Sequence, residues 1–195
     1  MAAQAAFYTI GHSTRSLEEF ASLLEPIAVA TLADVRTVPR SRTNPQFNSD
    51  ALSRELEVLR IAYRHVRELG GLRGRQRDIP PATNAYWENA SFHNYADYAM
   101  SDAFRAGLAT LRAFAQGGPC AIMCAEAVWW RCHRRIIADY LLHEGATVFH
   151  VLTPGRIEPA HLPEAARPGP HGTLVYPAKS QSPGERAEDL TGPDG

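Results

Sequence analysis

The sequence has little of several features that would place it in a special class. It holds only three cysteines, Cys120, Cys124 and Cys132, and an odd number does not fit a disulfide framework. No apolar run approaches the roughly 20 residues that a membrane span needs. The stretch Met1 to Ala6 lacks the basic and long apolar parts of a secretory signal. We therefore expect a cytoplasmic protein with no membrane segment.

Net charge is also nearly absent, at −1. A strong general attraction to nucleic acid is therefore not expected. Lysine is almost missing, because Lys179 is the only one and the other basic residues are arginines. The simplest interpretation of this bias is a GC-rich genome. Arginine nevertheless binds phosphate and carboxylate groups through two parallel hydrogen bonds, so individual arginines stay candidates for ligand binding.

What the sequence does have is an alternation of apolar strand patterns and amphipathic helix patterns. The continuously apolar run before Cys124 is typical of a central parallel strand. Strands are expected over 5–10, 29–35, 62–66, 119–124 and 146–152, and helices over 16–24, 51–60, 92–100, 102–116 and 131–143. This order predicts one α/β domain over residues 1–162, with an open, mainly parallel sheet of about five strands, helices on both faces and long basic loops.

The composition changes after this domain. Residues 163–195 are rich in proline, glycine, serine and charge, which predicts a flexible, largely disordered C-terminal tail. Its one apolar patch, Leu174-Val175-Tyr176, is a candidate for docking on the domain.

Polar and reactive residues follow three of the expected strands. They are Gly11, His12 and Ser13 after the first strand, Asp34 and Arg36 at the end of the second, and Cys124 and Glu126 after the fourth. Ligands of open parallel sheets bind at the carboxyl ends of the strands. We therefore predict a ligand site at this edge of the sheet.

Cys124 ends a buried strand, and the loop after it leads to a helix that opens with Cys132-His133-Arg134. A helix N-terminus binds oxyanions and lowers the pKa of a thiol, so Cys124 is a candidate nucleophile. The alternatives are a metal ligand and a structural cysteine. Six residues separate Cys124 from Arg131, where the loop of cysteine phosphatases has five, and none of the six is a glycine.

Other residues are assigned roles around this cysteine. Glu126 is a candidate general base or nucleophile, although a salt bridge with Arg134 or Arg36 is an alternative. His12 and His133 are candidate proton carriers. The candidate ligand-binding residues are Gly11, Ser13, Asp34, Arg36, Arg42 and Arg134. Asp34 and Arg36 share one face of their strand, so they can equally form an internal ion pair.

Cys124, Cys132 and His133 also form an alternative set of metal ligands, with His12 as a possible fourth. Zinc favours cysteine and histidine, but structural zinc sites usually contain two close pairs, and here a second pair is missing. The sequence assigns no particular cofactor.

Taken together, these motifs resemble the domain of unknown function 488 family. The matching residues are Thr9-Ile10-Gly11-His12-Ser13, Asp34-Val35-Arg36, Pro39-Arg40-Ser41-Arg42 with Pro45 and Phe47, Leu69-Gly70-Gly71, Cys124-Ala125-Glu126 and Cys132-His133-Arg134. They span residues 7 to about 155. One departure is the apolar run 127–130, where the family often carries polar residues. The resemblance implies a small bacterial α/β protein and supports the location of the site, but it supplies no reaction.

The leading hypothesis is an enzyme, of hydrolase or transferase type, that acts on a phosphorylated or nucleotide-like ligand. In it, Cys124 or Glu126 performs the chemistry beside an arginine-lined anion site. The alternatives are a nucleotide- or nucleic-acid-binding module without catalysis, which the neutral charge does not favour, and a metal-binding protein.

Overall fold

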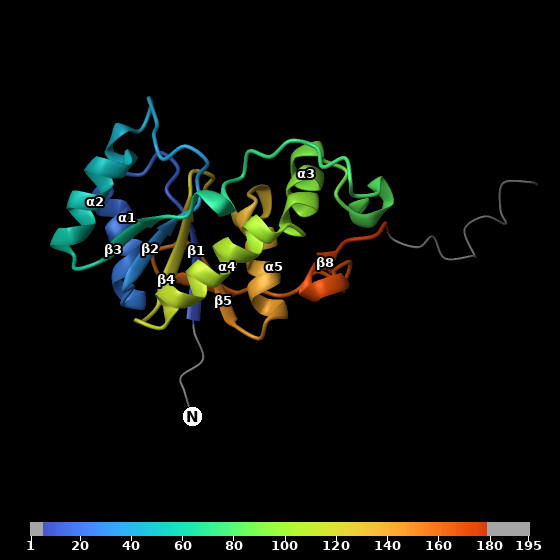
Figure 1. Ribbon diagram of the computed structural model, residues 1–195. Helices are drawn as coiled ribbons and strands as arrows, with labels where there is room; N and C mark the ends of the chain where they lie inside the picture. The colour runs from blue at the N-terminus through green and yellow to red at the C-terminus, as the bar shows by residue number, and fades with distance from the viewer. Residues whose placement is uncertain (1–5, 179–195) are drawn as a thin grey trace, which may run out of the picture.

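The computed structural model describes residues 6–178. Its main sheet has the strand order β3-β2-β4-β1-β5-β6, in which the first five strands are parallel and β6 runs antiparallel to β5 (Figure 1). The parallel strands are β1 (Ala6–Gly11), β2 (Thr31–Asp34), β3 (Ala62–His65), β4 (Cys120–Cys124) and β5 (Thr147–Thr153). The helices are α1 (Leu17–Leu24), α2 (Ser49–Val58), α3 (Ala90–Ala99), α4 (Asp102–Ala115) and α5 (Arg134–His143). The predicted α/β fold is confirmed.

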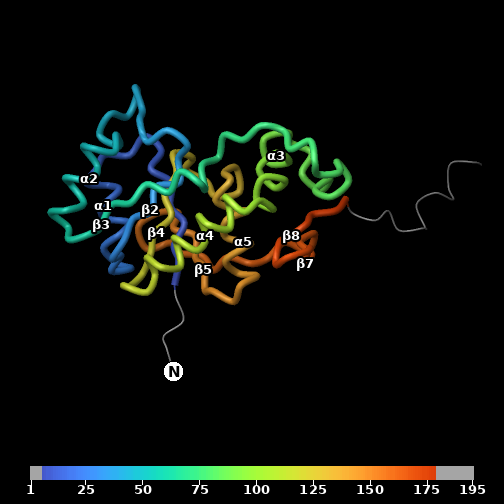
Figure 2. Tube along the Cα trace, viewed as in Figure 1, coloured from blue at the N-terminus to red at the C-terminus, as the bar shows by residue number. Residues whose placement is uncertain are grey.

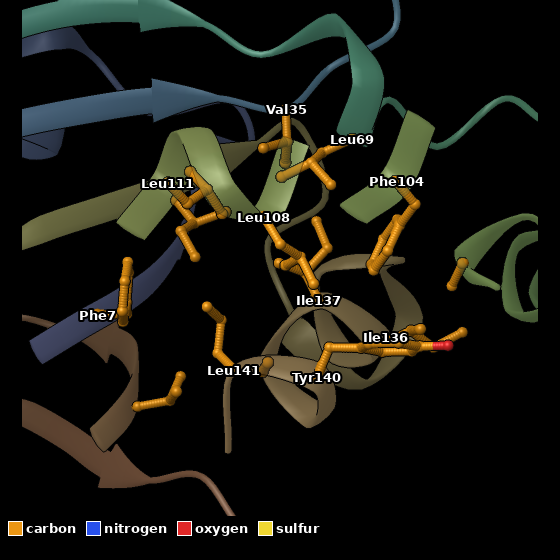
Figure 3. Close-up of a cluster of buried hydrophobic side chains, with 14 of the residues drawn as sticks. Phe7, Val35, Leu69, Phe104, Leu108, Leu111, Ile136, Ile137, Tyr140 and Leu141 are labelled. Carbon is orange, nitrogen blue, oxygen red and sulfur yellow. The ribbon is translucent and has the colours of Figure 1, made fainter. Parts of the chain in front are cut away.

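Two hydrophobic clusters cover the two faces of the sheet. Successive strand residues point to opposite faces, so Ala33 and Ile122 pack under α3, α4 and α5, whereas Leu32 and Ala121 pack under α1 and α2. Figure 3 shows part of the larger cluster, where Phe7 of β1 faces side chains from α4 and α5. Helices therefore lie on both faces, as predicted. Across the described part of the chain, no helix has the length and apolar character of a membrane span.

The last helix begins later than the sequence predicts. We expected it from residue 131, but Trp129–Arg131 form a separate 3-10 turn, η5, and α5 begins at Arg134. The reason is the backbone of Cys132, which is extended with φ −126° and ψ 145° and so interrupts the helical path. Cys132 and His133 therefore lie in the connection before the helix, where their side chains reach the end of the sheet.

The chain after β5 contains structure that the sequence did not predict. These elements are β6 (Arg156–Pro159), β7 (Arg167–Pro168) and β8 (Leu174–Val175). The apolar patch docks as expected: Tyr176 is fully buried, its N–H donates to Asn84 Oδ1, and its carbonyl accepts from the Tyr86 N–H. Figure 2 shows the short strands β7 and β8 beside each other near the end of the described chain. Residues 163–173, where disorder was expected, also follow a defined path. The remainder of the predicted tail, 179–195, lies outside the described residues.

This docking makes stability depend on pH through Asp139 of α5. The Tyr176 hydroxyl donates to Asp139 Oδ2 at 2.9 Å, and burial raises the pKa of this carboxyl to about 7. Between about pH 4 and pH 7 the folded chain holds a proton that the unfolded chain has lost, so this group makes stability fall as pH rises. Asp139→Asn keeps an acceptor but cannot ionise. Its stability relative to the parent chain should grow by up to about 4 kcal/mol across this window.

The measurement is urea unfolding of both chains from pH 4 to pH 8. His12 and His150, whose pKa burial lowers to about 4, also make stability depend on pH in this range. Both proteins contain them, so their contribution cancels in the difference between the two unfolding free energies. A difference in unfolding free energy that stays constant with pH would show that Asp139 does not titrate in this way.

Candidate functional site

A cavity of about 720 Å³ lies at the carboxyl ends of the parallel strands. The segments after β1, β2 and β4 form most of its wall, where parallel sheets bind ligands. Seven of the predicted site residues line it: His12, Ser13, Arg36, Cys124, Glu126, Cys132 and His133. Four others do not: Gly11, Asp34, Arg42 and Arg134. The structure thus brings together part of the predicted site. The arginines that line the cavity are Arg36, Arg40 and Arg131, whereas Arg36, Arg42 and Arg134 were predicted.

Cys124, Cys132 and His133 converge at the floor of this cavity. The two Sγ atoms and a ring nitrogen of His133 all lie within 4.8 Å of one another, and Cys132 Sγ lies 3.6 Å from His133 Nδ1. Tetrahedral zinc with ordinary Zn–S and Zn–N bonds would separate such ligand atoms by about 3.6–3.8 Å. The three atoms are therefore close to the spacing that a single metal ion requires.

His133 is held so that its Nδ1 is available as a ligand atom. His133 Nε2 lies 3.1 Å from the carbonyl oxygen of Val35, at the end of β2, and a carbonyl can only accept, so Nε2 carries the proton. The lone pair is then on Nδ1, on the side of the cysteines. Gly71 backs the ring: a Cβ on this residue would lie 2.8 Å from Cε1 and closer still to Nδ1. The chain can approach the imidazole this closely only because Gly71 has no side chain.

Arg134 is a buried cation beside Cys132. It is 1% exposed, its Nε donates to Cys132 Sγ at 3.2 Å, and its Nη2 donates to the carbonyl of Glu126. Among residues 6–178 no carboxylate pairs with it. A buried guanidinium without an anion is strongly unfavourable, so the sulfur of Cys132 is the group in position to balance its charge.

The thiols of Cys132 and Cys124 have pKa values shifted in opposite directions by their surroundings. Burial opposes ionisation of Cys132, but the hydrogen bond from Cys124 and the charge of Arg134 outweigh it and hold its pKa well below the usual range. The pKa of Cys124 lies well above the usual range, because Cys124 donates its hydrogen bond to Cys132 and is itself shielded from water. The sequence favoured Cys124 as the reactive thiol, whereas these contacts favour Cys132.

Asp34 and Arg36 form the internal ion pair that the sequence allowed as an alternative. Arg36 Nη2 lies 2.6 Å from Asp34 Oδ2, which also accepts from the Tyr63 hydroxyl at 2.7 Å. Arg36 also donates to the carbonyl of Phe47. Asp34 is fully buried and Arg36 is 5% exposed. This pair ties the loop after β2 to the sheet, and its charges neutralise each other.

His12 is engaged within the protein. Its Nδ1 lies 2.8 Å from the carbonyl of Ser13, its Nε2 faces Arg36 Nη1 at 3.3 Å, and its ring stacks on Phe47. Burial, aided by the charge of Arg36, lowers its pKa to about 4, so the ring is neutral at pH 7. Both ring nitrogens have protein partners, and these contacts do not favour the predicted role of proton carrier.

Gly11 serves the path of the chain. A Cβ there would lie 2.8 Å from Cα of Ala127 and would overlap the carbonyl oxygen of Glu126. The two residues after Gly11 hold the 124–127 loop in place, because the His12 and Ser13 N–H groups donate to the carbonyls of Cys124 and Ala125. Gly11 therefore positions the 124–127 loop and does not line the cavity.

The Glu126 side chain is exposed at the cavity wall. The salt bridge considered for it is not formed, since Arg134 donates to its backbone carbonyl. Within residues 6–178 the carboxylate accepts only from the Val128 N–H, at 3.4 Å to Oε1. The apolar run after it docks on the body, with Trp129 stacked on His150 of β5 at 4.1 Å. The carboxylate is thus free to face a ligand.

A comparison with known protein families gives a match over more than half of the chain. The family model described as Domain of unknown function DUF488 matches residues 16–141. The chain belongs to the DUF488 family. The DUF488 match extends from α1 into α5 and includes Cys124, Cys132 and His133. Comparisons with curated proteins and with solved structures give no match to this chain.

Proposed function

We propose that Cys124, Cys132 and His133 bind one zinc-type metal ion and that the chain is a metal-dependent enzyme of hydrolytic type. The observation that carries the proposal is the convergence of two sulfurs and one lone-pair nitrogen within 4.8 Å at the floor of a large cavity. Two sulfurs and an imidazole are the donors that zinc favours.

The number of ligands supports a catalytic site over a structural one. Structural zinc usually has four protein ligands, whereas catalytic zinc has three and leaves a position for water or substrate. Here three ligands meet at the wall of the cavity, so the fourth position would open into it. A metal ion in such a site lowers the pKa of a bound water and makes it a nucleophile near neutral pH.

The surrounding residues support the same proposal. The carbonyl of Val35 fixes the tautomer of His133, and the Nε–H of Arg134 donates to the Cys132 sulfur, which are the outer contacts that orient metal ligands. Glu126 is the one carboxylate among the described residues of the cavity wall, so it would accept or deliver the proton of the attacking water.

A second candidate is thiol chemistry without a metal, and the contact between Arg134 and Cys132 favours it. A thiolate held beside a buried guanidinium is a nucleophile at pH 7. Metal content separates the two candidates.

Elemental analysis of the purified, tag-free protein is expected to find about one equivalent of zinc or a similar metal per chain. Cys124→Ser should lose most of this metal, because the hydroxyl is a poor zinc ligand. Cys120→Ala is the matched control: Cys120 is buried in β4, burial raises its pKa to about 12, and it lies outside the cluster. Retention of the metal in Cys124→Ser, or its loss in Cys120→Ala, would contradict the proposed ligand set.

A further inference from the structure

The cavity wall contains two arginines that form no ion pair with the described residues. Arg40 follows β2, Arg131 ends η5, and both side chains are exposed. Within residues 6–178 neither side chain forms an ion pair, in contrast to Arg36, whose charge is neutralised by Asp34. β2 and β4 are neighbours in the sheet, so the segments that follow them bring both arginines to the wall of one cavity.

The loop after β4 adds backbone donors to the same cavity wall. The carbonyl of Cys124 accepts from the His12 N–H and the carbonyl of Glu126 accepts from Arg134. In a planar trans peptide the N–H points opposite to the carbonyl, so the N–H groups of Ala125 and Ala127 point away from those partners. Both residues line the cavity, and in the described part of the chain neither N–H has an acceptor.

The cavity wall also contains apolar side chains. Val38 and Leu72 are 58% and 78% exposed, and both line the cavity together with the half-buried ring of Phe92. A single exposed aliphatic residue needs no explanation, but three apolar side chains on the wall of one cavity form a surface that an organic group would cover. A bare inorganic anion would leave this surface in water.

We propose that the cavity binds an organic phosphate monoester, with its phosphate between Arg40, Arg131 and the N–H groups of the 125–127 loop and its organic group on Phe92, Val38 and Leu72. This subsite names the substrate class for the metal centre and rests on that proposed function for the reaction, but not for binding. Guanidinium groups and converging N–H groups are the donors that bind phosphate oxygens in proteins.

Calorimetric titration with adenosine monophosphate, inorganic phosphate and adenosine tests both ends of the subsite. The monophosphate is expected to bind more tightly than either part alone. Arg40→Ala and Arg131→Ala should each weaken its binding by about 10–100-fold, the usual effect of removing a charged hydrogen bond. Arg42→Ala is the matched control, because this exposed arginine lies in the same loop but outside the cavity wall.

No binding of the monophosphate at low ionic strength, binding no tighter than that of adenosine, or an equal loss in Arg42→Ala would overturn the subsite. Repeating the titrations after a chelator has removed any metal shows whether binding of the monophosphate depends on the metal centre. Binding that persists without metal supports the subsite whatever the metal content, whereas a protein that holds zinc but no phosphate ester would retain the metal centre and lose the subsite.

Discussion

Replacing Cys132 with serine is expected to abolish metal binding and to lower the free energy of unfolding of the metal-free protein by about 3–5 kcal/mol. A serine hydroxyl stays neutral at pH 7, so the variant loses a soft ligand and also leaves the guanidinium of Arg134 buried without an anion. The second effect arises from the 3.2 Å contact between Arg134 Nε and Cys132 Sγ and from the 1% exposure of the arginine. Chemical unfolding in the presence of a chelator measures it without any contribution from the metal.

A double-mutant cycle separates this charge pair from simple loss of packing. Arg134→Met removes the cation, so the double variant Cys132→Ser/Arg134→Met should be less destabilised than the sum of the two single variants by about 1–3 kcal/mol. If the two effects add, Cys132 is not the counter-ion of Arg134. The Cys120→Ala variant, which removes a thiol outside the cluster, should keep its metal throughout.

Gly71→Ala is expected to weaken zinc binding by about 10–100-fold without altering any ligand, which is the usual effect of disturbing the groups that orient a ligand. The new methyl group would stand over the His133 ring, 2.8 Å from Cε1 and 2.9 Å from Cγ, so the ring must move. Movement of the ring breaks its hydrogen bond to the Val35 carbonyl and turns Nδ1 away from the sulfurs. Competition with a chromophoric zinc chelator measures the affinity.

Gly74→Ala is the control for this experiment, because a Cβ on Gly74 would meet no atom within 4 Å. It changes the same loop by the same methyl group. Equal affinities in the two alanine variants and the parent chain would mean that His133 does not ligate the metal.

Much of the fold follows directly from apolar patterns in the sequence. β4 is continuously apolar and proves to be a central strand. The helix expected over 16–24 forms as α1, which begins at Leu17. β6 escaped prediction because Arg156–Pro159 is a short edge strand whose residues are exposed or half-buried, so it carries no apolar alternation. The start of α5 was misplaced because one extended residue, Cys132, breaks a sequence that otherwise favours a helix.

The location of the cavity was predictable, but the contacts of the residues around it were not. The strand ends mark the cavity, since parallel strands bring their polar termini to one edge. The sequence gives no sign that Arg36 and Arg134 are buried, because arginine is almost always exposed. For this reason Arg36 and Arg134, and not Arg131, were predicted from the sequence as candidate anion ligands. The close approach of Gly71 to His133 joins residues from separate segments and is visible only after folding.

Titration of the reduced, tag-free, chelator-treated protein with Co²⁺ tests the metal centre most directly. The account predicts a thiolate-to-cobalt charge-transfer absorption together with the strong visible bands of tetrahedral cobalt, and both should saturate at about one equivalent per chain and vanish when zinc is added. Weak visible bands of six-coordinate cobalt with no charge-transfer absorption would contradict it, and would leave Cys132 as a thiolate held by Arg134 without a metal.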